Sequence, residues 1–351
     1  MWSIVVKSMS SRAAVLQAPH RFALVDRAVP VPERGDVVVR VAATAVCHTD
    51  LAIYTGEHPG VLYPRVMGHE ATGVVESVGA DVRRLTAGQR VVIDPIIACG
   101  SCDCCRRGQG NLCRNAGLLG REMDGTLAQH VALPARYVHA LPPHLPLAAA
   151  TLIETMATVR HAQQRVGIAD GETVVVLGQG ATGLLHTKLA KLAGAHRVIG
   201  VSRSPWKLEL AQRFGADHVV GGDEDAAAAV GRLTGGAGAD VVIDTAGGSE
   251  LLALSMRMLR PGGRLLLYAI SHQPVEGFST FPVYYKELTI YGARALTTGD
   301  FEPCIELAAA GTIDLAPFVT AEYPLQHVAA AFAEYQRAPE RVLRLVILPE
   351  A

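Results

Sequence analysis

The sequence predicts an α/β protein of two domains, one an antiparallel, barrel-like β structure and the other a doubly wound parallel sheet. The chain has 351 residues, enough for about two domains, and 50% of them are hydrophobic, which is ample for two cores. Residues 12 to about 155 carry short apolar runs broken by Gly and Pro, a pattern typical of an antiparallel barrel. From about residue 156, apolar strands alternate with helical segments, which indicates a parallel sheet covered on both faces.

The second domain has the clearer order of elements. A buried strand is expected at residues 173–177, followed by three glycines, a helix to about residue 192, and a strand at 197–201. Ser204 and Pro205 mark the next helix as its N-cap and first residue, and this helix should end near Gly215. Further strands are expected at 218–220, 241–244 and 264–270.

In the first domain, the runs 37–39 and 91–93 are the clearest strands. The tail after about residue 296 returns to the irregular, β-rich pattern of this domain. We therefore expect residues 11–155 and 296–351 to form the first domain, and residues 156–295 to form the second.

Bulk composition excludes several classes of function. The formal net charge is −1, basic residues are not massed in one segment, and aromatic residues make up only 5% of the chain. Neither nucleic acid nor an anionic membrane surface is therefore an expected partner. No stretch approaches the ~20 apolar residues needed to span a bilayer.

Cysteines are concentrated in one part of the chain. Six of the seven lie between Cys47 and Cys113, and Cys304 stands alone. Residues 1–12 contain only a very short apolar run and do not read as a signal peptide. Clustered thiols without an export signal are metal ligands more often than disulfides, so the expected compartment is the reducing cytoplasm.

Four of these thiols predict a closed metal site. The spacing C-x2-C-x2-C-x7-C is formed by Cys99, Cys102, Cys105 and Cys113. Four thiolates this close together can complete the tetrahedral coordination of a structural Zn²⁺. Cys104 falls outside the regular spacing and is assigned as a non-ligand. A rubredoxin-like iron site and a redox thiol cluster are the alternatives, and the ligand type favours zinc.

A second set of metal-binding side chains lies upstream. Cys47 opens the motif CHTD, and His69 and Glu70 belong to GHE. An open zinc site needs three protein ligands and one position for water or substrate. A lone Cys or His is more often a core residue than a metal ligand. The motifs around Cys47 and His69 must therefore show which of the two they are.

Three glycines predict a dinucleotide site. Gly178, Gly180 and Gly183 form GxGxxG between an apolar strand and a helix, which is the required context. The first glycine permits the tight turn, the second lets backbone amides approach a pyrophosphate, and the third lets helix and strand pack. The helix N-terminus adds partial positive charge, so this turn is expected to bind a dinucleotide rather than only to connect two elements.

The end of the second strand bears on the choice of coenzyme. NAD sites place an acidic residue there, about 20 residues after the glycines, to bind the ribose 2′-hydroxyl. This chain has Ser202 and Arg203 instead, and a hydroxyl with a guanidinium suits a 2′-phosphate. NADP(H) is therefore favoured, with NAD(H) possible.

These motifs together resemble a known family. Five motifs occur in one chain: CHTD at 47–50, GHEATGVVESVG at 68–79, the cysteine lobe at 99–113, the segment at 123–142 and VVVLGQGATG at 174–183. In this combination the chain resembles the zinc-dependent alcohol dehydrogenases of the medium-chain dehydrogenase/reductase superfamily, and their polyol and threonine dehydrogenase branch in particular. The resemblance implies a GroES-like β-barrel catalytic domain, a doubly wound Rossmann coenzyme domain, and a homodimer or homotetramer.

The resemblance also implies roles for individual residues. Cys47 and His69 match ligands of the catalytic zinc, and Glu154 falls where the third ligand lies. Glu70 matches a carboxylate beside the zinc that can bind it directly or through water. Asp50 would orient His69, as ligating histidines usually require.

Further matches concern the coenzyme and the proton. His48 is placed to meet the coenzyme pyrophosphate, and Thr158, four residues after Glu154, matches a threonine that contacts the nicotinamide. Thr49 matches the hydroxyl residue that takes the substrate proton. Many relatives have a histidine three residues later; here that position is Ala52, so the proton would leave through water or another group, such as His58.

The expected activity is reversible hydride transfer between a small alcohol, secondary or polyol-like, and NAD(P), giving a ketone or aldehyde. Two zinc ions per chain are expected, one catalytic and one structural. The alternative is a non-catalytic, NADPH-binding redox sensor that uses the thiols and zinc. A sensor has no reason to keep an open metal site with a proton acceptor beside it, so Cys47, His69, Glu154 and Thr49 argue for the enzyme.

Overall fold

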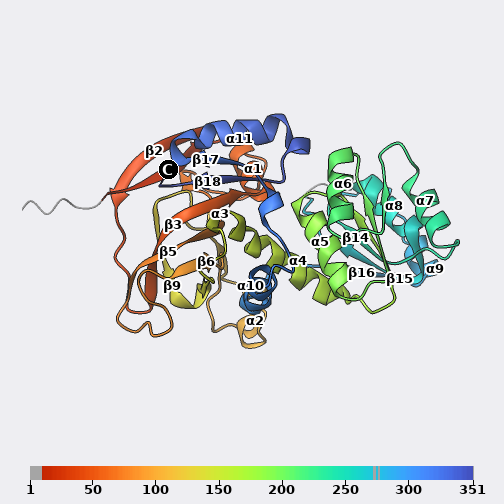
Figure 1. The fold of residues 1–351 in the computed structure, drawn as a ribbon, viewed down its shortest axis with the longest axis horizontal. Coiled ribbons are helices and arrows are strands. Elements are labelled where there is room, and N and C mark those ends of the chain that lie inside the picture. The colour runs from red at the N-terminus through yellow and green to blue at the C-terminus, as the bar shows by residue number, and fades with distance from the viewer. Residues whose placement is uncertain (1–9, 272–273, 276, 351) are drawn as a thin grey trace, which may run out of the picture. The chain divides into compact units, whose positions relative to one another are not determined.

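The chain divides into two compact units in a computed structural model that describes residues 10–271, 274–275 and 277–350 (Figure 1). One unit contains the residues up to Thr155 together with those from Thr297 onward, and the other contains Met156–Leu296. Residues 1–9, which make up most of the segment without an expected signal peptide, lie outside the described residues.

The first unit is built on a mixed sheet in which most strands are antiparallel. In the described residues this sheet has seven strands, six in the order β10-β6-β5-β3-β18-β17, with β9 pairing with β3. Its strands are β10 (Val138–Ala140), β6 (Arg90–Ile93), β5 (Glu70–Val78), β3 (Asp36–Val46), β18 (Arg344–Leu348), β17 (Val319–Pro324) and β9 (His130–Pro134). The tail thus supplies two strands to a sheet made otherwise of N-terminal residues. The predicted strands at 37–39 and 91–93 are confirmed within β3 and β6.

Shorter elements complete this unit. A three-stranded sheet has the order β2-β1-β4, and β7 pairs with β8. These strands are β1 (Ser10–Ala18), β2 (Arg21–Ala28), β4 (Arg65–Val66), β7 (Ile96–Ile97) and β8 (Gly117–Leu118). The helices are α1 (His48–Thr55), α2 (Asp103–Arg106), α3 (Leu147–Ala150), α10 (Phe301–Ala309) and α11 (Val328–Arg337). Helix α4 (Leu152–Val166) carries the chain into the second unit.

The second unit is a parallel sheet with helices between its strands. The described residues give six strands in the order β13-β12-β11-β14-β15-β16, so the strand order reverses between β11 and β14. The strands are β11 (Thr173–Leu177), β12 (Arg197–Val201), β13 (His218–Val220), β14 (Ala239–Asp244), β15 (Leu259–Leu267) and β16 (Thr289–Gly292). The helices are α5 (Ala181–Leu192), α6 (Pro205–Arg213), α7 (Ala226–Leu233), α8 (Ser249–Met258) and α9 (Phe281–Tyr285). A ligand is expected at the carboxyl edge, at the point where the order reverses.

Most predicted elements of this unit are confirmed, with one correction. The strand predicted at 264–270 ends at Leu267, because the N–H groups of Tyr268 and Ala269 both donate to the carbonyl of Asp244 and leave the ladder. Ser204 is confirmed as the N-cap of α6 and Pro205 as its first residue, although the Ser204 side chain makes no capping bond. Its N–H instead donates to Ser202 Oγ at 3.2 Å.

None of the helices in the described residues is both long and apolar enough to cross a membrane.

Candidate metal and coenzyme sites

Cys47 is held at the start of helix α1. It is the N-cap residue, its Sγ accepts the N–H of Thr49 at 3.2 Å, and its own N–H donates to Asp50 Oδ2 at 3.1 Å. This capping box fixes the thiol at a helix N-terminus, where backbone N–H groups favour the thiolate. The CHTD sequence therefore shapes its own turn locally.

The turn before β5 places His69 beside Cys47. Its Nε2 lies 3.0 Å from Cys47 Sγ, and its Nδ1 lies 3.5 Å from Asp50 Oδ1. Asp50 also accepts the N–H of Gly68 at 3.1 Å, which ties the two segments together. The Asp50 carboxylate orients the imidazole, as ligating histidines usually require.

The ionisable side chains of this group are buried together and interact strongly. Cys47, Asp50 and His69 are all buried, and their ligand atoms lie within 4.8 Å of one another. Burial raises the pKa of Cys47 and opposes the charge of His69, but the neighbouring Cys47 and Asp50 outweigh that effect and raise the pKa of His69. A thiolate and an imidazole at this spacing match the ligand chemistry of Zn²⁺.

Glu70 has a different partner. Its two oxygens accept hydrogen bonds from Arg344 Nε at 2.8 Å and Arg344 Nη2 at 3.1 Å, and both side chains are buried. Arg344 Nη2 also lies 3.3 Å from Thr155 Oγ1. This two-pronged pair engages both oxygens of Glu70. Sequence reasoning missed Arg344, although one charged residue in the apolar strand β18 was a usable signal.

Glu154 lies buried in the first turn of α4. Burial raises its pKa to about 8, the charge of Glu70 adds to this, and His69 and Arg344 oppose it. These influences place Glu154 in the same electrostatic environment as His69 and Glu70. It does not belong to the compact group of Cys47, Asp50 and His69. A carboxylate held in this environment would be stabilised by a nearby divalent cation.

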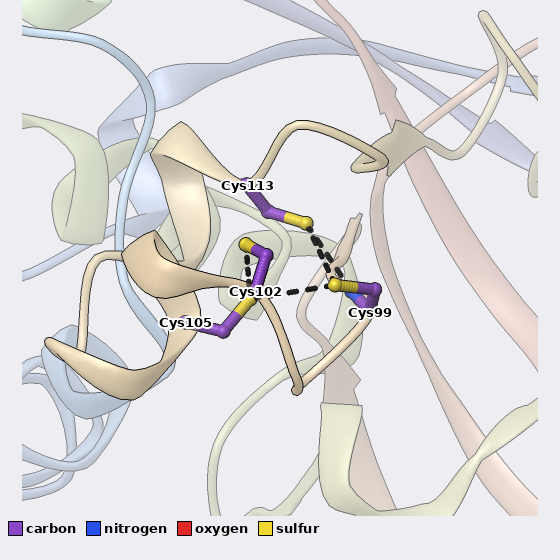
Figure 2. A group of neighbouring side chains, drawn as sticks. All are labelled: Cys99, Cys102, Cys105 and Cys113. Atoms are coloured by element: carbon purple, nitrogen blue, oxygen red, sulfur yellow. Dashed lines mark hydrogen bonds between the residues drawn. The ribbon is translucent and has the colours of Figure 1, made fainter.

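The four lobe cysteines converge on one centre. Figure 2 shows the side chains of Cys99, Cys102, Cys105 and Cys113 gathered around one point. The Sγ–Sγ distances are 3.4 Å for Cys99–Cys113, 3.5 Å for Cys102–Cys105 and 3.9 Å for Cys99–Cys105. Four sulfurs at ~2.3 Å from a tetrahedral Zn²⁺ would lie roughly 3.8 Å apart, so the cluster fits a closed zinc site.

The pKa shifts of these thiols show that they cannot all ionise easily without a cation. Backbone N–H groups of Ser101 and Cys102 lower the pKa of Cys99 to about 6, whereas desolvation and the neighbouring thiols raise that of Cys105 to about 12. All four thiols can ionise together only around a metal ion. Cys104 is not in the group; its Sγ lies 3.6 Å from Arg107 Nη2.

The glycine turn joins β11 to α5. Gly178 has φ +84°, which favours glycine, and a Cβ on Gly183 would lie 1.9 Å from the Gly178 carbonyl oxygen. A Cβ on Gly180 would meet nothing within 4 Å. The buried Gln179 side chain folds back onto Val176, its Nε2 donating to that carbonyl at 3.0 Å, and leaves the mouth of the turn open. The helix N-terminus thus faces open space, as an anion site requires.

The remaining predicted residues occupy distinct places. Ser202 and the exposed Arg203 directly follow β12, one strand away from the glycine turn. His48 is exposed on α1, and Thr49 is half-buried beside Cys47. The Thr158 hydroxyl lies 2.6 Å from the hydroxyl of Tyr268, a partner that sequence reasoning missed.

The group proposed to replace the missing relay histidine lies close to its position along the backbone. The N–H of His58 donates to the carbonyl of Ala52 at 3.0 Å, and His58 Nδ1 lies 3.0 Å from the carbonyl of Pro59.

Comparison with known proteins gives a consistent result. The family model described as the alcohol dehydrogenase GroES-like domain matches residues 33–143, and the model described as zinc-binding dehydrogenase matches residues 181–310. A 2-dehydro-3-deoxy-L-galactonate 5-dehydrogenase of Pseudoalteromonas atlantica is 33% identical over 93% of this chain and 95% of its own. A D-arabitol-phosphate dehydrogenase of Enterococcus avium is 30% identical over 98% of this chain and 99% of its own.

Solved structures agree in fold. A putative zinc-binding dehydrogenase of Sinorhizobium meliloti 1021, bound to NADP, has a TM-score of 0.90 and 30% identity, covering 97% of this chain and 100% of its own. An Escherichia coli CFT073 alcohol dehydrogenase solved with NADH has a TM-score of 0.90 and 27% identity, covering 97% of this chain and 99% of its own.

Proposed function

The chain belongs to the zinc-dependent alcohol dehydrogenase family of medium-chain dehydrogenases, and we propose that it oxidises a polyol or related secondary alcohol reversibly with NADP(H). The reaction class is that of the family: alcohol and carbonyl interconverted with zinc and a nicotinamide coenzyme. One observation carries the proposal, namely the buried group of Cys47, Asp50 and His69, with Thr49 directly beside the thiol.

Each residue of the site has a separate role in the proposed reaction. When bound, zinc supplies a Lewis acid for the alcohol oxygen, and the coenzyme supplies the hydride acceptor. Cys47 and His69 would hold the zinc, and Asp50 keeps His69 in its orientation. Thr49 would receive the substrate proton, which then leaves through water or through His58, whose backbone bonds to that of Ala52.

We assign Glu154 as the third ligand of the catalytic zinc and keep Glu70 as a neighbour engaged by Arg344. Glu70 already has a donor for each oxygen, whereas Glu154 is buried next to the same charges and gains most from a cation. Cys99, Cys102, Cys105 and Cys113 would hold a structural zinc, which gives two zinc ions per chain. In this assignment residues 11–155 and 296–351 form the catalytic domain, and residues 156–295 bind the coenzyme.

The preference for NADP(H) rests on the end of β12. Gly178, Gly180 and Gly183 would cradle the pyrophosphate. His48 keeps the coenzyme-binding role that the family resemblance implies. Ser202 and Arg203 offer a hydroxyl and a guanidinium to a 2′-phosphate, and no carboxylate stands at either position to bind a free 2′-hydroxyl. Thr158 is assigned to the nicotinamide.

The named relatives, the free thiols and the surface support the proposed substrate class, compartment and oligomeric state. Three of the similar proteins are named for a sugar acid, a polyol phosphate and a polyol, which supports a polyhydroxylated substrate. The seven free thiols support a reducing cytoplasm. A homodimer or homotetramer is supported by the outer edge of β16, which no described strand covers, and by exposed Phe281, Tyr284 and Tyr285 on α9.

A coenzyme-coupled absorbance assay tests the proposal. Zinc-loaded protein is offered polyols and secondary alcohols with NADP and with NAD, and the corresponding ketones with NADPH and NADH. We expect turnover with a polyol-type substrate, faster with NADP(H), that is lost in Cys47→Ala and kept in the control Cys104→Ser.

Each other result has a distinct meaning. Faster turnover with NAD(H) would overturn the coenzyme assignment alone. Turnover retained in Cys47→Ala would overturn the metal mechanism.

A further inference from the structure

Four side chains form a connected row inside the second unit. Gln163 and Thr158 come from α4, His186 from α5, and Tyr268 follows the end of β15. The Thr158 and Tyr268 hydroxyl oxygens lie 2.6 Å apart, and the rings of Tyr268 and His186 form an edge-to-face pair with centroids 4.7 Å apart and planes at 85°. The row thus runs from a hydroxyl pair through two rings to a buried amide.

The inner end of the row is rigid. His186 is fully buried, and Gln163 Nε2 lies 2.8 Å from its carbonyl oxygen and 3.2 Å from its Nδ1. Burial lowers the pKa of His186 to about 3, so the ring is neutral. With the Gln163 amide donating to Nδ1, the ring proton is on Nε2, which has no hydrogen-bond partner in the described part of the chain. A buried polar atom left in this way is costly, so packing alone does not account for a histidine here.

The outer end of the row lies at the edge where a dinucleotide binds. The Tyr268 N–H donates to the carbonyl of Asp244 at the carboxyl end of β14. Ser202 and Arg203, the proposed contacts of the adenosine ribose, follow β12 on the other side of the point where the strand order reverses. A dinucleotide crosses this point, so its nicotinamide half lies toward β14 and β15. Thr158 and Tyr268 are only half-buried, so part of each residue remains accessible to a ligand.

We propose that Tyr268 is a positioning residue for the nicotinamide half of the coenzyme, acting through Thr158, and that His186 and Gln163 fix its ring. The inference rests on the proposed function, because it takes the bound ligand to be a nicotinamide dinucleotide. The hydroxyl pair restricts rotation of Thr158, and a preorganised contact loses less entropy when the coenzyme binds.

The test compares whole coenzyme with a fragment that lacks the nicotinamide. Tyr268→Phe keeps the ring against His186 and removes only the hydroxyl. We expect this variant to bind NADPH about 10-fold more weakly and 2′-phospho-ADP-ribose as tightly as the unmodified protein, by calorimetric titration. If NADH is the better coenzyme, the matching pair is NADH and ADP-ribose. Tyr284→Phe, on exposed α9, is the matched control and should change neither affinity.

A double-mutant cycle tests the route through Thr158. If Tyr268 acts through that hydroxyl, Thr158→Val with Tyr268→Phe should bind NADPH no more weakly than Thr158→Val alone. Equal loss of affinity for NADPH and the fragment would overturn the proposal, because it would indicate a general structural defect. Additive losses in the cycle would also overturn it.

His186→Leu offers a second route should the tyrosine variant fold poorly. It places an apolar side chain of similar size at this position and removes the ring that packs against Tyr268. The same selective loss for NADPH is expected, whereas unchanged binding would count against the role of His186. The proposed function fails separately, if the unmodified protein binds no nicotinamide coenzyme. Normal coenzyme binding by both the unmodified protein and Tyr268→Phe removes only this inference.

Discussion

Gly180 and Gly183 belong to one turn but tolerate a methyl group very differently. In Gly183→Ala the new Cβ would lie 1.9 Å from the Gly178 carbonyl oxygen, so the turn must open, and we expect a loss of stability of about 2–4 kcal/mol. In Gly180→Ala the Cβ meets nothing within 4 Å, and φ is an ordinary −73°. This variant should keep its melting temperature but bind coenzyme about 10-fold more weakly, because the methyl occupies the approach to the pyrophosphate.

Thermal unfolding and calorimetric titration, run on both variants, separate the two effects. A Gly180→Ala protein that binds coenzyme normally would contradict the assignment of this turn as the pyrophosphate site.

His139 makes the first unit sensitive to acid. Its ring stacks on Phe301 with centroids 4.5 Å apart, and burial, helped by the charge of Arg84, lowers its pKa to about 4. The unfolded chain binds this proton near pH 6.5, so stability is present above that pH and is lost as the pH falls toward 4. At pH 5 the loss through this group is about 2 kcal/mol.

The variant His139→Phe keeps a ring against Phe301 and cannot titrate. Urea unfolding at pH 7.5 and pH 5 should show a smaller acid loss in the variant than in the unmodified protein, by the same ~2 kcal/mol. Equal acid losses in the two proteins would show that this histidine does not titrate as inferred.

Among the elements, the cysteine lobe (residues 99–113) has little secondary structure or buried core to stabilise it apart from its four clustered thiols. Between Cys99 and Cys113 it contains a four-residue helix, α2, and one short 3₁₀ turn, and most of its side chains are at least partly exposed. A segment with so small a core depends on its metal for its fold. Cys105→Ser should therefore lose one of two zinc equivalents and become open to protease within the lobe.

Cys104→Ser is the matched control, because Cys104 lies next in sequence but outside the group of four. Zinc analysis and limited proteolysis provide the measurement. Loss of zinc in the control as well would mean that Cys104, not only its neighbour, binds the metal.

Elements that depend on local pattern could be read from the sequence, and contacts between distant segments could not. Strands β11, β12 and β13 have the predicted bounds because apolar runs and glycines mark them locally. The Arg344–Glu70 pair joins residues 274 apart, and Thr158–Tyr268 joins residues 110 apart. Nothing in a local pattern encodes such a pairing, so the ligand types in the candidate site were predictable, whereas the residues that support them were not. The predicted end of β15 was wrong for the same reason. The strand stops at Leu267 because the next two N–H groups donate to the carbonyl of Asp244, which lies on another strand.

At the scale of the whole molecule, β16 gives the clearest reason to expect more than one copy. Its outer edge is uncovered by any described strand, and Ile290 on it is 37% exposed. The segment Thr289–Gly292 has no Lys or Pro to block edge pairing, and the net charge of −1 gives two copies little reason to repel. An antiparallel β16–β16 contact about a two-fold axis would bury this edge.

A lysine on that edge should therefore break the assembly. Ile290→Lys places a charge where the second copy would pair, and we expect its mass by light scattering to fall to a smaller species than the unmodified protein. Leu24→Lys changes a residue of similar exposure, 43%, on β2 of the other unit and should leave the mass unchanged. The Ile290→Lys chain should keep its zinc, because the side chain lies outside the core. If the unmodified protein is monomeric, the proposed oligomer is wrong. If it is an oligomer whose mass Ile290→Lys leaves unchanged, the interface lies on another surface.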